Sequence, residues 1–165
     1  MDSIFHRTSV RDYLNKEVEQ EKIDRILSAG MQAPSATNQQ PWEFYLVTNK
    51  EALQKLGKSG PYSGPAGKAP CAIVSVYRKN GLRVPDCAPI DLSIAMENIW
   101  LETDAQGLGG VWIATYPMQE RMDAVRQILD IPDDLVPFAL FPFGYPASAH
   151  PQENRTDLSR IHYVR

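Results

Sequence analysis

The sequence contains little cysteine, no long apolar run and no excess of basic residues. Its two cysteines, Cys71 and Cys87, are too few for the disulfide framework of a small secreted protein. The opening residues, MDSIFHRTSV, lack the basic and apolar regions of a signal peptide, and no apolar stretch is long enough to span a bilayer. We therefore expect a cytoplasmic protein with reduced thiols and no membrane partner.

Charge and composition exclude further classes of protein. A formal net charge of -3 gives no basic surface of the kind that binds nucleic acid. With 43% hydrophobic and 22% charged residues among 165, the chain has the composition of an ordinary globular protein, and its fold can bury about 70% of the unfolded surface. We expect a single domain over residues 1–165 that binds small molecules and no nucleic acid.

Common catalytic motifs are missing as well. The stretch GLGG at 107–110 follows a predicted helix instead of a strand, so it is not a dinucleotide-binding fingerprint. The stretch GPAGKA at 64–69 lacks the first glycine and the Ser/Thr of a P-loop. The histidines have no metal-ligand spacing with each other or with the cysteines, and no G-x-S-x-G elbow is present. We assign no metal site and no catalytic residue to the protein itself.

Hydrophobic periodicity and turn residues predict alternating helices and strands without a repeat. Helices are expected over 17–32, 50–58, 89–110 (ended by its glycines at 107–110) and 117–131, and strands over 42–49, 71–77, 111–116 and 135–146. The last strand should be interrupted, because Pro137 and Pro142 cannot donate to a central ladder. The polar tail that follows is expected to be ordered only where it docks on another surface.

The segment HRTSVRDY near the start of the chain offers a site for a phosphate. Arg7, Ser9 and Arg11 stand at alternate positions, so in an extended segment their side chains project to one side. Two guanidinium groups that flank a hydroxyl can bind a phosphate through permanently charged, bidentate donors. The spacing alone is also typical of a solvated basic turn, so this segment leaves both interpretations open.

The stretch APSATNQQPWEF at 33–44 lies between a predicted helix and a predicted strand. It contains no charged residue before its tryptophan. Its small hydroxyl and amide side chains are those of Ser35, Thr37, Asn38, Gln39 and Gln40. A turn needs fewer residues, and a solvated loop normally carries charges. The composition indicates that the amides and backbone groups of this loop face something neutral, planar and polar.

Four segments together resemble the nitroreductase family of flavoproteins. RTSVRDY is similar to the family's R-R-S-x-R-x-[FY] segment, and APSATNQQPWEF to its A-P-S-x-x-N-x-Q-P-W-x-F segment. DLSIAMENIWLETDAQGLGGVWI resembles the central helix that ends in G-L-G-x-x-W, and PFGYPASAHPQENR with RIHY resembles the G-Y-P and C-terminal elements. The resemblance covers essentially the whole chain. Thr8 departs from the family's second arginine, and Ala114 from a glycine that the family often has.

The resemblance implies an α+β fold of three layers, in which helices flank a central, mostly antiparallel sheet. It also implies an intertwined homodimer, with the tail over about 147–165 docked on the partner subunit, and non-covalently bound FMN. Residues implied at the FMN phosphate are Arg7, Thr8, Ser9 and Arg155, and Arg11 is implied at the N1–C2=O edge of the ring. Residues implied at the ring are Pro34, Ser35, Ala36 and Asn38 from the other subunit, together with Ile113, Ala114 and Thr115.

The implied function is that of an FMN-dependent oxidoreductase that uses NAD(P)H as a transient co-substrate. It would reduce nitroaromatics or quinones by ping-pong hydride transfer through flavin N5. Two alternatives use the same residues: another flavin reaction such as dehalogenation, and an FMN-binding protein without turnover. The motifs do not distinguish NADH from NADPH or name the physiological oxidant, because substrate choice is set in the variable loops.

Overall fold

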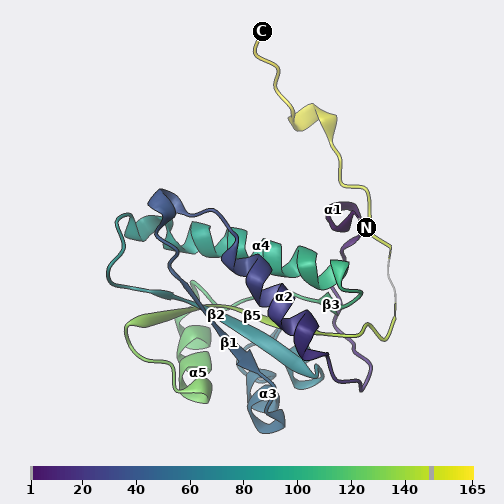
Figure 1. The fold of residues 1–165 in the computed structure, drawn as a ribbon, viewed down its shortest axis with the longest axis vertical. Helices are drawn as coiled ribbons and strands as arrows, with labels where there is room; N and C mark the ends of the chain where they lie inside the picture. The colour runs from purple at the N-terminus through teal and green to yellow at the C-terminus, as the bar shows by residue number, and fades with distance from the viewer. Residues whose placement is uncertain (1, 149–150) are drawn as a thin grey trace.

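The core of the protein is an antiparallel sheet of five strands. We describe residues 2–148 and 151–165 of the chain in a computed structural model (Figure 1). The strands are β1 (Trp42–Val47), β2 (Cys71–Arg78), β3 (Gly109–Gly110), β4 (Ile113–Ala114) and β5 (Leu135–Gly144). Their order is β1-β2-β5-β3, and β4 also pairs with β5. The longest strand, β5, is therefore paired on both sides.

Helices cover both faces of this sheet. The α-helices are α1 (Ser3–His6), α2 (Gln20–Met31), α3 (Lys50–Leu56), α4 (Ala88–Ala105) and α5 (Gln119–Leu129), and the short 3-10 turns are η1 (Ala36–Asn38), η2 (Gly64–Gly67), η3 (Pro85–Cys87) and η4 (Leu158–Arg160). Figure 1 shows α2 and α4 on one side of the sheet and α3 and α5 on the other. The expected three-layer α+β fold with an antiparallel sheet is confirmed.

The side chains of β2 pack against the helices on both faces of the sheet. Ile73 packs in the cluster that contains the buried residues of α2 and α4, whereas Val74 and Val76 pack in the cluster that contains those of α3 and α5. Successive side chains of a strand point to opposite faces, and both faces are covered here. The strand is consequently buried from Cys71 to Val76, which accounts for a sequence that is apolar except at Ser75, whose hydroxyl donates to Ala139 O.

The expectation that prolines interrupt the last strand is wrong. β5 runs without a break, with Pro137 opposite Val76 and Pro142 opposite Ala72. The register shifts between Ser75 and Val76, beside Pro137, and such an irregularity accommodates a residue that cannot donate to the ladder. The strand expected over 111–116 is reduced to the two residues of β4.

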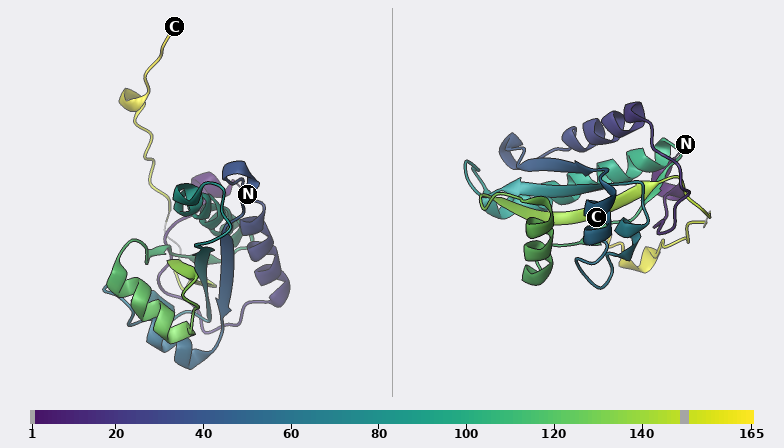
Figure 2. Two further views of the ribbon diagram at one scale, coloured as in Figure 1. Left: turned by 90° about the vertical axis from the view of Figure 1, so that its left-hand side faces the viewer. Right: turned by 90° about the horizontal axis from the view of Figure 1, so that it is seen from below.

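The C-terminal tail leaves the body of the protein. Residues 151–165 extend away from the sheet and helices (Figures 1 and 2), and most of them are exposed. Only its base is attached to the N-terminal segment, where Gln152 Nε2 donates to Ile4 O at 3.1 Å and to Arg7 O at 2.9 Å. Two residues of the expected docking tail, 149 and 150, lie outside the described residues. Docking of the tail on a partner subunit stays a prediction.

Candidate functional site

The arginine-containing segment over residues 7–11 runs beside the edge of the sheet. Ser9 forms a parallel bridge with Gly110, and Val10 N donates to Gly110 O at 3.0 Å. The approach is so close that a Cβ on Gly109 would collide with the Val10 side chain, which explains the need for glycine there. The sheet thus fixes the middle of the segment.

A buried tyrosine ties the same segment to β5. The Tyr13 hydroxyl donates to Val10 O at 2.7 Å and to Pro142 O at 3.0 Å. Burial is the main cause that raises the pKa of Tyr13, so the phenol stays protonated and donates at neutral pH. The hydroxyl therefore joins the segment to the central strand of the sheet.

The two arginines of the segment lie in different environments. The Arg7 guanidinium packs over the Trp100 ring, 4.0 Å from its centroid, and its side chain is only 15% exposed. Arg7 Nε lies 3.9 Å from Glu97 Oε1, which is too far for a hydrogen bond. Arg11 is exposed, and within the described residues its guanidinium makes one long hydrogen bond, of 3.4 Å, to Ser9 O. In this structure the guanidinium groups of Arg7 and Arg11 therefore contact different residues.

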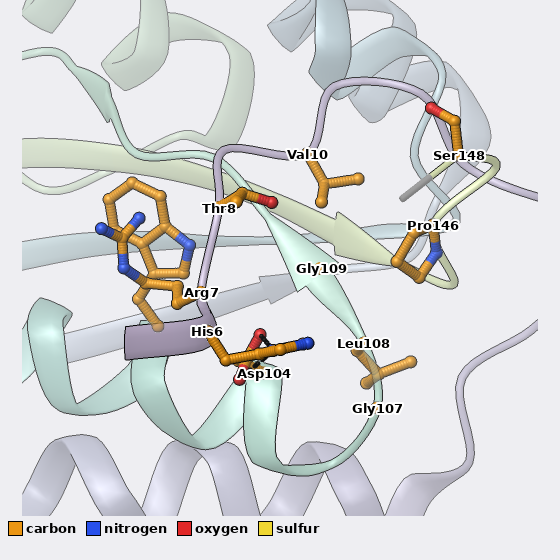
Figure 3. Close-up of a pocket in the computed structure, with 11 residues that line it drawn as sticks. His6, Arg7, Thr8, Val10, Asp104, Gly107, Leu108, Gly109, Pro146 and Ser148 are labelled. Atoms are coloured by element: carbon orange, nitrogen blue, oxygen red, sulfur yellow. Dashed lines mark hydrogen bonds and ion pairs between the residues drawn. The ribbon is translucent and has the colours of Figure 1, made fainter. Parts of the chain in front are cut away.

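A pocket of about 140 Å³ lies beside this segment, between its first residues and the carboxyl end of α4 (Figure 3). Its lining includes Arg7, Thr8 and Trp100. Among the described side chains, Arg7 Nε and Trp100 Nε1 are buried donors without a hydrogen-bond partner. Because buried donors are normally paired, two unpaired donors beside one pocket fit a site for a ligand that carries acceptors, as a phosphate does.

The uncharged loop over residues 33–41 is held by a carboxylate of α4. Asp91, only 2% exposed, accepts from Ala36 N at 2.8 Å through Oδ1 and from Gln39 Nε2 at 2.7 Å through Oδ2. Gln39 also exchanges two hydrogen bonds with the backbone of Val84, each of 3.0 Å. Asp91 is therefore a structural charge, and the expectation that the amides of the loop face a ligand is wrong for Gln39.

The backbone of this loop is strained. Thr37, Asn38 and Gln40 all have positive φ angles, of 51°, 55° and 44°, a region that L-residues adopt at a cost. Two bonds from Gln40 stabilise the conformation: its N donates to Ser35 Oγ and its Nε2 to Asn38 Oδ1, both at 3.0 Å. Pro34 and Asn38 remain exposed. The loop is thus a preformed, uncharged surface.

The loop and the arginine segment lie at opposite ends of α4. Asp91 stands in the first turn of this helix and holds the loop, while Asp104 stands in its last turn and contacts His6. Thirteen residues separate the two aspartates, which at about 1.5 Å per residue is about 20 Å. Within one chain, the two sequence-predicted halves of the site are therefore far apart.

The remaining sequence-predicted residues are dispersed. Ile113 and Thr115 are buried, whereas Ala114 between them is exposed and its carbonyl accepts from Arg121 NH1 at 3.0 Å. Arg155 lies exposed in the tail. Lys68, which the sequence could not assign to the flavin site, donates from Nζ to Asp12 Oδ1 at 2.7 Å beside the arginine segment. That contact joins residues 56 apart, so spacing in the sequence could not reveal it.

Other reactive groups do not form a second centre. Burial raises the pKa of the Cys71 thiol to about 12, so this cysteine is protonated and inert at neutral pH. The described residues include no group of three or more His, Cys, Asp or Glu that could hold a metal ion. In the same parts of the chain, no helix has the length and apolar character to cross a membrane.

The model of the nitroreductase family matches residues 4–60 and 58–145 of the chain. The chain belongs to the nitroreductase family. A protein of Methanothermobacter thermautotrophicus, provisionally named NADH dehydrogenase/NAD(P)H nitroreductase, is 38% identical over 162 residues, which cover 98% of this chain and 85% of that protein. This nitroreductase-family protein is thus similar to its relative along almost its whole length.

Solved structures of the nitroreductase family agree with the fold described above. A crystal structure from Clostridium acetobutylicum, provisionally named NADH oxidase, superposes with a TM-score of 0.96 at 37% identity and covers 99% of both chains. An FMN-dependent nitroreductase from Clostridium difficile superposes with a TM-score of 0.92 at 29% identity, over 99% of this chain and 98% of that one. The protein is an oxidoreductase of this family with the family's α+β fold.

Proposed function

We propose that the protein is an FMN-dependent NAD(P)H oxidoreductase that reduces nitroaromatics or quinones. Membership of the nitroreductase family supports this activity, as do a relative named for NAD(P)H and another named for FMN. The observation that carries the proposal is the pocket beside Arg7, whose lining includes the permanently charged Arg7 and Trp100, each with a buried donor nitrogen that has no hydrogen-bond partner. An anion with several acceptor oxygens fits that chemistry.

Each half of the site has its own task. The cationic half would hold the FMN phosphate through Arg7, the backbone of Thr8, Ser9 and, once the tail is docked, Arg155. Arg11, which is exposed beside Ser9, would face the N1–C2=O edge of the ring. The uncharged half would place four loop residues against the ring: Pro34, Ser35, Ala36 and Asn38. Further ring contacts are assigned to Ile113, Ala114 and Thr115, of which Ala114 is the exposed one.

The separation of the two halves supports a site built by two copies of the chain. A helix about 20 Å long between Asp91 and Asp104 keeps the loop away from the arginine segment of its own chain. A homodimer would present the loop of one copy to the arginine segment of the other. The tail would dock on the partner subunit, and its exposed residues would then contact the surface of that subunit.

Exposed apolar side chains on α4 and α1 also favour a homodimer. Ile90 and Ile94 stand one turn apart on α4 and are 60% and 37% exposed, and Ile4 and Phe5 of α1 are 61% and 74% exposed. Exposed large apolar side chains on neighbouring helices are typical of an interaction site. Burial of these residues between two copies would stabilise the dimer through the hydrophobic effect.

When bound, FMN would supply the chemistry, accepting a hydride from NAD(P)H at N5 and passing the electrons to the second substrate. The chain's own residues would bind and orient. Arg7 would neutralise phosphate charge, Arg11 would favour the reduced ring, and the strained loop would offer an uncharged surface that costs little reorganisation on binding. We assign no general acid or base to the protein.

Purification and reconstitution test this proposal. The apoprotein should bind FMN more tightly than riboflavin, elute as a dimer in light scattering, and oxidise NADH or NADPH at a steady rate when a quinone is added. An FMN complex that neither oxidises a nicotinamide nor reduces a quinone would instead indicate a non-catalytic binding protein. Turnover with a halogenated phenol and none with quinones or nitroaromatics would indicate the dehalogenase alternative. A monomer loaded with FMN would contradict the two-chain site.

A further inference from the structure

His6 and Asp104 form a hydrogen-bonded pair beside the pocket that Arg7 lines. His6 Nδ1 lies 2.8 Å from Asp104 Oδ1 and 3.0 Å from Oδ2, and Figure 3 shows the two side chains against each other at the carboxyl end of α4. A carboxylate can only accept, so Nδ1 carries the proton in this contact. The pair joins residues that are 98 apart in the sequence.

The position of Asp104 is unfavourable without this partner. Its side chain is only 10% exposed, and it stands in the last turn of α4, where the helix dipole disfavours a negative charge. No basic residue occupies that turn. A buried carboxylate at such a place needs a donor from outside the helix, and the described structure supplies it from His6.

His6 also immediately precedes the residues that are proposed to hold the FMN phosphate. Farther along the segment, the backbone is fixed by the bond from Val10 N to Gly110 O. At its start, Arg7 N donates to Ser3 O within α1, and the His6 side chain links α1 to α4. Arg7, Thr8 and Ser9 are thus held between one attachment to the sheet and another to α4.

We propose that His6 and Asp104 are positioning residues for the phosphate end of the FMN site. The pair fixes the start of the segment over residues 7–9, so that Arg7 and the backbone of Thr8 are preorganised before the ligand arrives. His6 and Asp104 act through these residues and not by contact with the reacting atoms. The proposal rests on the proposed function, because it presupposes that the segment binds a phosphate.

The test compares FMN with riboflavin, which lacks the phosphate. Dissociation constants of both flavins are measured by fluorescence quenching on the apoprotein and on the variants His6→Ala and His6→Asn. The ratio of the riboflavin constant to the FMN constant should fall at least about fivefold in His6→Ala, a typical lower bound for coupling between sites. It should return to within about twofold of the parent in His6→Asn, whose amide nitrogen can replace Nδ1 as a donor. Because the His6 side chain is 61% exposed, neither change should prevent folding.

A matched control and a partner variant complete the design. Arg25→Ala removes a different ion pair of α4, that of Arg25 Nε with Glu102 Oε1 at 2.5 Å, and should leave the ratio unchanged. Asp104→Ala, which removes the acceptor of the His6 hydrogen bond, should lower the ratio as His6→Ala does, and the double variant should add little, because the two residues act as one unit.

Three outcomes would overturn the proposal, each for a different reason. If the parent binds both flavins equally, the phosphate site itself is wrong, and the proposed function loses its main support together with this inference. If the parent prefers FMN and His6→Ala keeps the parent's ratio, only the positioning role is wrong. A variant in which both constants rise equally would show a merely structural pair, which also contradicts the proposal.

Discussion

Two buried aspartates of α4 hold the two halves of the proposed site, but under opposite electrostatic conditions. Asp91 stands in the first turn, where the helix dipole favours a carboxylate, and it accepts from a backbone amide and a side-chain amide of the loop. Asp104 stands in the last turn, where the dipole disfavours it, and its partner is the single ring of His6. The first contact therefore stabilises the fold, whereas the second mainly fixes a neighbouring segment.

The two halves also differ in backbone conformation. The loop contains three non-glycine residues with positive φ and is held from within by its own amides. The arginine segment has no such angle among its described residues and is held from outside, by the sheet and by α4. We infer that the loop is a rigid surface and that the arginine segment depends more on its anchors. The predictions below test this difference.

The largest effect is expected for Asp91→Ala. The substitution leaves Ala36 N and Gln39 Nε2 without an acceptor and removes a favourable charge from the start of the helix. The free energy of unfolding should fall by about 2–4 kcal/mol, as measured by urea denaturation of the apoprotein. Asp86→Ala, at an exposed aspartate of η3, is the control and should have little effect. A loss below about 1 kcal/mol for Asp91→Ala would show that other contacts hold the loop.

Replacement of the two arginines proposed to bind the phosphate should have the next largest effect. Arg7→Ala and Arg155→Ala each remove charge-assisted hydrogen bonds, worth about 1.5–3 kcal/mol, and should weaken FMN binding about tenfold to a hundredfold. Riboflavin binding should change much less. Isothermal titration of both flavins provides the measurement, with the exposed Arg83→Ala as the control. Unchanged FMN affinity in either variant would remove that arginine from the site.

A smaller effect is expected for Arg11→Gln. A fixed charge near the N1–C2=O edge favours the reduced, anionic ring, but Arg11 is exposed to solvent, which weakens the interaction. A loss of about 1–1.4 kcal/mol corresponds to a fall of about 20–30 mV in the two-electron potential. Redox titration of the FMN complex measures it, with Lys58→Gln at another exposed cation as the control. A potential that rises would place Arg11 away from the ring.

Local sequence patterns predicted the parts of the fold that depend on neighbouring residues. Hydrophobic periodicity predicted a helix over 17–32, and α2 lies within that range, with Ile23, Ile26 and Gly30 buried. The continuity of β5 could not be predicted in this way. The irregularity that accommodates Pro137 depends on the register with β2, about 60 residues earlier in the chain, and no local pattern reports that register.

The site was predictable only in part for the same reason. The resemblance to the family singled out the loop and the arginine segment. It could not show which of their side chains are engaged in contacts within the protein instead of facing a ligand. Gln39 turns inward because Asp91 offers an acceptor, and Arg7 turns onto Trp100, both through contacts distant in the sequence. The sequence did not predict a role for His6, because the role of a single histidine depends on the group that it contacts in the fold.

The smallest effect, and the sharpest comparison of the two backbones, is expected for glycine substitutions. Thr37 has a φ of 51°, which is costly for a β-branched residue, so Thr37→Gly relieves strain while it increases the entropy of the unfolded chain. The two effects nearly cancel, and the apoprotein should become more stable by at most about 1 kcal/mol. Thr8→Gly, in the unstrained segment, relieves nothing and should lose about 0.5–1 kcal/mol. Urea denaturation of both variants decides the matter. If both lose stability equally, the positive φ of Thr37 is not a source of strain, and the loop is no more preformed than the arginine segment.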